Sequence, residues 1–332
     1  MTDTATTARP SRGFPISMAA LAPFIALAAL LVLGTIVNPN FFSVDNLVNV
    51  ATRSAFIAII AIGGTFVISA GGLDLSVGSM SAFVASLMIL FMNTALIDNP
   101  FMLLILAMLL AIAVGALCGL TNGIITTVGK IEPFIATLGT MGIFRGLTTW
   151  LSQGGSITMK SLEVRDLYRP VYFSNVFGVP VPVLIILGMA AVGAFIFYRT
   201  AYGRHVIAVG SNEDVARYSG IPVGRVRTIT YVIQGICVAV AVLVYVPRLG
   251  SATATTGLLW ELQAITAVVI GGTALRGGVG RIWGTICGAF ILEIVGNIML
   301  LSDFISEYLI GAVQGAIIII AMLVQRSLMR RT

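Results

Sequence analysis

The sequence predicts an all-α polytopic protein that crosses a membrane many times. Only 10% of its 332 residues are charged, 58% are hydrophobic and the mean hydropathy is +1.03. A soluble domain carries about 25% charged residues, so this chain lacks the polar surface needed to face water on all sides. The apolar residues gather in repeated runs of about 20, which is the length of a bilayer-spanning helix.

Ten apolar runs account for residues 16–325, which we interpret as one transmembrane domain of about ten helices. The first run is too long for a signal peptide, lacks an Ala-x-Ala-like cleavage site and is followed by more spans. The segment 43–53 is polar on one side, so we expect it to lie along the membrane interface before the second helix. The junction between the second and third helices and the short eighth helix are each open to being broken or re-entrant. The predicted helices are 16–37, 52–71, 75–93, 101–127, 132–151, 180–198, 228–246, 258–272, 282–301 and 307–325.

Glycines four residues apart mark several of these helices. Small residues at this spacing let helix backbones approach closely in lipid. We expect the marked faces to pack inside the chain, with a dimer contact as the alternative for one of them. The glycines are Gly115, Gly119 and Gly123 on the fourth helix, Gly142 and Gly146 on the fifth, Gly284 and Gly288 on the ninth, and Gly311 and Gly315 on the tenth.

The basic residues predict the orientation. If the tails 1–15 and 326–332 are cytoplasmic, 13 of the 19 Lys and Arg residues fall in cytoplasmic segments. The positive-inside rule therefore places both termini in the cytoplasm. The longest outer loop is then 152–179, which mixes charged and aromatic residues. It is either a solvated connector or an outer docking surface.

A polar cytoplasmic loop, 199–227, stands out between the sixth and seventh helices. It holds five Arg residues, the only His residue of the chain and an acidic pair, although nearly everything around it is apolar. We expect a cytoplasmic protein to dock on it.

Within this loop the sequence predicts a short helix. Asn212 can cap a first turn that carries Glu213 and Asp214, which suits the positive end of the helix dipole. Gly220 then ends the helix. Val215 and Tyr218 would present an apolar surface to the docking protein.

Sequence patterns for nucleotide binding and catalysis are not met. The stretch 123–130 has the wrong spacing for a Walker A loop, and the glycine run 271–280 does not fit the dinucleotide fingerprint. The single His excludes a His-rich metal site, and the three Cys residues lie in apolar runs, which suggests no disulfide framework. The net charge of +6 is scattered over short loops and does not indicate a nucleic-acid partner. We expect no catalytic residue, metal or cofactor on this chain.

The apolar region around residues 55–93 is interrupted by GGLDLSVGS at 71–79. The glycine pair breaks the helix, and Asp74 can cap the next one, with Ser76 adding a hydroxyl at membrane depth. This interruption is either a cap with a tight turn or a broken helix that lines a translocation path.

Together with this interruption, further motifs in the same order resemble one family: permease subunits of ATP-binding-cassette (ABC) importers for monosaccharides of the ribose, xylose, arabinose and galactose group. The resemblance covers roughly 55–325. The further motifs are PFIATLG at 133–139, Arg145-Gly146, GR at 203–204, GSNEDVA at 210–216, SGI at 219–221, AVVIGGT at 267–273 and GGVGR at 277–281.

The resemblance implies a permease in the bacterial inner membrane, surrounded by lipid, with a fold similar to that of cobalamin-importer permeases. Its partners would be a cytoplasmic ATP-binding subunit, a periplasmic sugar-binding protein and a second permease copy, identical or paralogous. ATP would be bound and hydrolysed by the partner subunit. The coupling residues of the family map onto Asn212, Glu213, Asp214, Ala216, Arg217, Ser219, Gly220 and Ile221.

A neutral sugar needs hydrogen-bonding groups along its path. Arg145 is either such a group or a side chain that snorkels to the outer interface. Glu293, in the ninth helix, is not part of the family pattern; it must face the interior or be protonated, with Asn297 one turn away as a candidate partner. The path candidates are Asp74, Ser76, Asn122, Thr137, Thr140, Arg145 and Gln153.

Two other functions stay open at this point. One is a secondary transporter driven by protons or sodium, with Asp74 and Glu293 as ion sites. The other is an ABC permease for a different small polar solute, such as a branched-chain amino acid or a nucleoside.

Overall fold

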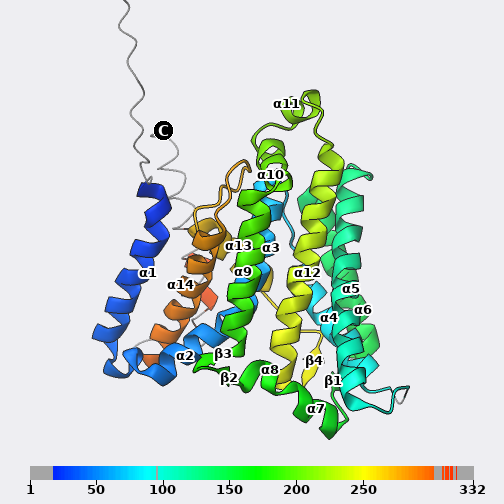
Figure 1. Cartoon of the computed structure of the whole chain (residues 1–332), viewed down its shortest axis with the longest axis vertical. Helices are drawn as coiled ribbons and strands as arrows, with labels where there is room; N and C mark the ends of the chain where they lie inside the picture. Colours follow the sequence, from blue (N-terminus) through cyan, green and yellow to red (C-terminus); the bar gives the residue numbers. More distant parts are fainter. Residues whose placement is uncertain are drawn as a thin grey trace, which may run out of the picture.

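The computed structural model describes residues 18–94 and 96–302, together with 309, 311–313, 315–316 and 319. Its long helices run side by side between two ends (Figure 1). They are α1 (Met18–Val37), α3 (Ala55–Ser69), α4 (Val77–Met92), α5 (Pro100–Thr127), α6 (Pro133–Ser152), α9 (Val181–Arg199), α12 (Val223–Leu249), α13 (Trp260–Ile270) and α14 (Ile282–Leu301).

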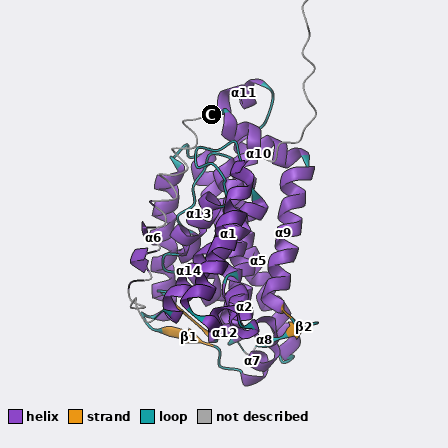
Figure 2. Cartoon of the chain, turned by 90° about the vertical axis from the view of Figure 1, so that its left-hand side faces the viewer, coloured by secondary structure: helices purple, strands orange, loops and turns teal. Residues whose placement is uncertain are grey.

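Short elements close the two ends of the bundle. Among the described residues, α10 (Ala201–Ser211) and α11 (Glu213–Tyr218) lie at one end, which we call the α11 end. The strands lie at the opposite, sheet end (Figure 2). There β1 (Ser156–Thr158) pairs antiparallel with β4 (Ser251–Thr253), and β2 (Asn175–Val176) with β3 (Val179–Pro180). The sheet end also holds η1 (Pro39–Phe42), α2 (Val44–Arg53), α7 (Leu162–Tyr168) and α8 (Pro170–Phe173).

Each of the first nine predicted ranges contains a helix within the described residues. The tenth, 307–325, lies largely outside them, as do both tails, so the count of ten stays a prediction. By length and composition, four of the described helices are able to cross a membrane, or five if α2 and α3 form one span bent by 42°.

The helix α3 forms the centre of the bundle. Nearly every residue from Ala55 to Ser69 is buried, which is expected of a helix that is apolar on all sides. It packs against α9, α12, α13 and α14. The polar segments that follow it are therefore held in the interior of the chain.

The predicted close packing at glycine is confirmed on two helices. A Cβ atom at Gly119 of α5 would lie 2.1 Å from the Tyr231 carbonyl oxygen of α12. One at Gly284 of α14 would lie 2.0 Å from the Gly271 carbonyl at the end of α13. Gly142 and Gly146 of α6 differ, because a Cβ there would meet no atom within 4 Å. Internal packing is therefore wrong for the Gly142–Gly146 face of α6 as far as the described residues go, although α6 packs on α4 and α5 through other residues, and the dimer alternative remains for that face.

Two of these helices, α4 and α13, lead from a shared contact toward opposite ends of the bundle. The helix α4 reaches the sheet end, where the Asn93 amide donates to the Thr158 carbonyl, and α13 reaches the α11 end beside the start of α14. Their beginnings meet where Gly78 contacts Gly257, because a side chain at either glycine would clash with the other backbone. Within the described residues, the second–third junction is an irregular segment between α3 and α4, and the eighth helix is the short α13; that either is a broken or re-entrant span stays a prediction.

Candidate functional site

The break between α3 and α4 contains a buried polar cluster. The Asp74 carboxylate accepts hydrogen bonds from the Ser76 backbone N–H at 2.9 Å and from its hydroxyl at 2.6 Å. From α5, the Asn122 amide donates to the Ser76 hydroxyl oxygen at 2.8 Å and lies 3.4 Å from both Asp74 oxygens. Asp74 is 6% exposed, and Ser76 and Asn122 are fully buried. The cluster therefore satisfies backbone and side-chain donors that the break leaves free.

Two threonines of α6 reach this break only at its edge. The Thr137 hydroxyl donates to the Pro133 carbonyl at 2.8 Å and lies 3.4 Å from the Leu73 carbonyl. Thr140 donates to the Thr137 carbonyl of its own helix. Gln153 is exposed at the far end of α6 with φ of 49°, so the structure does not bring it to the cluster.

Two residues of α12 that the sequence analysis missed hold the same region. The Tyr231 hydroxyl donates to the Leu73 carbonyl at 3.2 Å. The buried Gln234 amide donates to the Ile60 carbonyl of α3 at 3.2 Å. Residues 227, 231 and 234 share one face of a helix, and this polar spacing in an apolar run is a signal that points to them.

A small cavity lies beside the cluster, lined by Asp74, Gln234 and Glu261 among apolar neighbours. Its volume of about 10 Å³ is close to the space that one water molecule needs. A monosaccharide cannot occupy it.

The N-cap residue of α4 is Ser76, and its side chain makes no capping hydrogen bond, so the predicted cap by Asp74 is wrong. Asp74 instead closes a turn by accepting from the Ser76 backbone N–H two residues on.

Arg145 of α6 fixes the loop that leads into α13. Its guanidinium donates to the Ala254 carbonyl and, at 2.8 Å, to the Thr256 carbonyl. These are internal contacts, so the side chain does not reach for the membrane interface. Arg145 holds the loop whose Gly257 contacts the start of α4.

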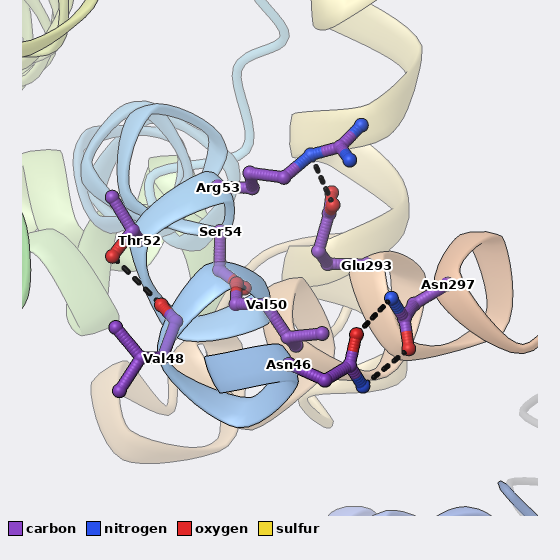
Figure 3. Close-up of polar contacts among 8 residues, drawn as sticks. All are labelled: Asn46, Val48, Val50, Thr52, Arg53, Ser54, Glu293 and Asn297. Atoms are coloured by element: carbon purple, nitrogen blue, oxygen red, sulfur yellow. Dashed lines mark hydrogen bonds and ion pairs between the residues drawn. The ribbon is translucent and has the colours of Figure 1, made fainter. Parts of the chain in front are cut away.

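Glu293 has a different partner from the one expected. Its carboxylate lies 3.0 Å from the Arg53 Nε atom at the end of α2 (Figure 3). Asn297 instead exchanges two hydrogen bonds with Asn46, at 3.0 and 2.8 Å. The proposed Glu293–Asn297 pair is therefore wrong. A partner more than 200 positions away leaves no local signal in the sequence.

The loop 199–227 contains the short helix that the sequence predicts. The Asn212 side chain accepts from the Val215 backbone N–H at 3.0 Å, and α11 spans Glu213–Tyr218. Gly220 follows with φ of 80°. Val215 and Tyr218 are 60% and 91% exposed. This short helix is capped at both ends. It exposes an apolar surface, formed by Val215 and Tyr218, at the α11 end.

The preceding helix α10 was missed because it is short and lacks a long apolar run. It packs against α12, where the Tyr202 hydroxyl donates to the Val226 carbonyl at 3.1 Å. Burial raises the pKa of the Tyr202 phenol above its ordinary value, so the hydroxyl stays a donor even in alkaline solution. The helices α10 and α11 are therefore fixed to α12.

Comparisons with known proteins place these features in context. A family model described as the permease component of a branched-chain amino acid transport system matches residues 46–322. The ribose import permease protein of Haemophilus influenzae is 39% identical over 90% of this chain and 91% of its own length. The D-allose transport system permease protein of Escherichia coli is 31% identical over 91% and 90%, respectively. A solved inward-facing metal-chelate type ABC transporter aligns at 16% identity with a TM-score of 0.47, over 92% of this chain and 97% of that one.

Proposed function

The chain belongs to the family of transport-system permease components, and from that membership we propose that it is the membrane-spanning subunit of an ATP-driven monosaccharide importer. The family description names branched-chain amino acids, but relatives that match nine tenths of the chain are named for ribose and D-allose. Both are monosaccharides, which supports a neutral sugar as the substrate.

The exposed surface of α11 carries the proposed mechanism. A cytoplasmic ATP-binding subunit docks on it through Val215 and Tyr218, with the coupling residues Asn212, Glu213, Asp214, Ala216, Arg217, Ser219, Gly220 and Ile221 forming the contact and its caps. ATP is hydrolysed on that subunit, and this chain supplies no catalytic group. The α11 end is then cytoplasmic, and so are both termini of a ten-helix protein in the inner membrane.

The sheet end receives the sugar from a periplasmic binding protein. The elements β1, β4, α7 and α8 form that end of the chain. A second permease copy packs on the face of α6 where a Cβ at Gly142 or Gly146 would meet no described residue within 4 Å. The sugar passes between the two copies as they open alternately to either side.

The path candidates Asp74, Ser76, Asn122, Thr137 and Thr140 act mainly by shaping the break, and Arg145 by holding the loop before α13.

An ion-coupled secondary transporter is the competing function. It requires Asp74 and Glu293 to be available to ions. Asp74 accepts two hydrogen bonds from Ser76, and Glu293 is paired with Arg53. These protein contacts disfavour ion sites and favour the importer.

Purification of the complex from native membranes tests the docking. We expect an ATP-binding subunit to co-elute with the wild-type chain and to be lost from the Tyr218→Asp variant. Retention of the ATP-binding subunit by a correctly inserted Tyr218→Asp variant would remove α11 from the docking surface.

A further inference from the structure

One side chain, Arg227 in the second turn of α12, connects α11 to the break between α3 and α4. Its Nη1 atom lies 2.8 Å from a Glu213 carboxylate oxygen at the start of α11. Its Nε atom donates to the Ala70 carbonyl at the end of α3, at 3.4 Å. Because a guanidinium is planar and carries several donors, one Arg residue can make both contacts at once.

Glu213 divides its two oxygens between two Arg residues. Oε1 pairs with Arg217 of the same short helix at 2.6 Å, and Oε2 pairs with Arg227 of α12. The Arg217 pair stays within α11. The Arg227 pair crosses to α12, and within the described residues Glu213 is the only carboxylate that Arg227 contacts. Any displacement of α11 therefore acts directly on the Arg227 side chain.

The contacts of Arg227 continue along α12 to the polar cluster. Ala70 is followed by Gly71 with φ of 79°, and two residues later the Leu73 carbonyl accepts from Tyr231, one turn beyond Arg227. Asp74 comes next and anchors the start of α4 through Ser76. The segment from Ala70 to Asp74 is thus held against one face of α12 by hydrogen bonds at Ala70 and Leu73. Its backbone has no regular secondary structure, which leaves it free of helical hydrogen bonds that would oppose a change of conformation.

We propose that Arg227 is the positioning residue that transmits movement of α11 to the break between α3 and α4. The inference rests on the proposed function, in which an ATP-binding subunit moves α11. When that subunit pulls α11, the Glu213–Arg227 pair turns the guanidinium, and its bond to the Ala70 carbonyl shifts the segment that carries Asp74. Glu213 and Arg227 side chains are 35% and 26% exposed, so the pair is partly shielded from solvent.

The test measures sugar uptake per ATP hydrolysed by the complete complex in proteoliposomes. We expect Arg227→Gln to assemble and hydrolyse ATP, while the uptake per ATP falls about fivefold or more, the lower range of allosteric coupling. A ratio equal to the wild-type value would overturn the proposal. If the Gln variant does not accumulate, Arg227→Lys replaces it, because Lys keeps the charge but lacks the forked guanidinium. An intermediate ratio is then expected, and an unchanged ratio contradicts the proposal.

Two neighbouring arginines provide matched controls. Arg225→Gln removes the same charge from an exposed position of the same helix, and we expect an unchanged ratio. Arg217→Gln removes the other partner of Glu213, inside α11. Weaker docking there would lower ATP hydrolysis and uptake together and leave their ratio unchanged. If uptake per ATP falls in all three variants, the effect comes from losing any positive charge in this region, and the proposal is overturned.

Exchanging the charges of Glu213 and Arg227 distinguishes two roles of Arg227: transmitting the movement of α11, or only holding α11 in place. The double variant Glu213→Arg with Arg227→Glu can restore an ion pair, but a carboxylate cannot donate to the Ala70 carbonyl. We expect this variant to assemble, as Arg227→Gln does, while its uptake per ATP stays low. Full recovery of the ratio would show that Arg227 only holds α11 in place. Failure of the proposed function is distinct, because no ATP-binding subunit would then co-elute with the wild-type chain.

Discussion

Asp74 shows how one side chain stabilises an interruption inside a membrane helix. Irregular backbone is tolerated in a membrane only where it is buried in protein or lines a water-filled cavity, and Asp74 is buried and accepts from Ser76 twice. Its structural contribution comes from an acceptor oxygen, which an Asn side chain also supplies.

We therefore expect Asp74→Asn to change stability by less than about 1 kcal/mol and to leave most uptake intact, because Asn and Asp both form turns in which the side-chain oxygen accepts from the backbone N–H two residues on. Thermal unfolding of the purified complex and sugar uptake check this. A well-assembled variant without uptake would show that the charge itself takes part in the mechanism.

Arg145 binds carbonyl groups of the loop before α13, and we expect its removal to loosen that loop. Arg145→Leu should lower uptake strongly, and Arg145→Lys should restore it only in part, because one atom, Nη1, makes both carbonyl contacts and the shorter Lys side chain places its nitrogen one bond nearer the backbone. Uptake assays at equal membrane expression measure both. Wild-type uptake by the Leu variant would show that transport does not depend on the contact of Arg145 with this loop.

At the scale of elements, α2 is fastened to α14 by polar pairs on top of a small apolar cluster. Arg53 pairs with Glu293 and Asn46 with Asn297 (Figure 3). The small cluster consists of the buried side chains Phe41, Val50 and Ile294. The α2–α14 contact thereby fixes the sheet end of the bundle.

We expect Arg53→Ala to destabilise the protein more than Glu293→Ala. The Glu293 side chain is 26% exposed and would be left with an unpaired charge, whereas Arg53 is 45% exposed and can be solvated. In a double-mutant cycle the coupling should be about 1 kcal/mol. Additive effects on the melting transition would argue against the pair.

The turn after α11 has a strict backbone requirement. Gly220 has φ of 80°, which residues other than glycine adopt at a cost. Gly220→Trp should therefore displace α11 and abolish uptake while membrane insertion persists. Protease protection and substrate-stimulated ATP hydrolysis report on insertion and docking. Normal hydrolysis and uptake in this variant would contradict the docking role of α11.

Over the whole molecule, apolar runs predicted helices well because burial in lipid requires long apolar segments. The range 282–301 coincides with α14, and 101–127 differs from α5 by one residue. Short polar helices such as α10 were missed for the same reason. The first turns of α12 were also missed, because Arg225 and Arg227 made them resemble a loop.

The site was predictable where its contacts are local. Asn212 with Val215 follows from the capping rules, and Asp74 with Ser76 is the turn that an Asp side chain favours with the backbone N–H two residues on. The partners of Glu293, Arg145 and Arg227 lie far away in the chain, so only the three-dimensional packing brings them together.

Reconstitution with defined energy sources tests the central claim most directly. The chain, its co-purified partners and a sugar-loaded binding protein are placed in liposomes, and uptake is measured with internal ATP or with an imposed proton or sodium gradient. The account predicts uptake that requires ATP and the binding protein and is insensitive to an uncoupler. Uptake driven by an ion gradient without ATP, and abolished by the uncoupler, would contradict it.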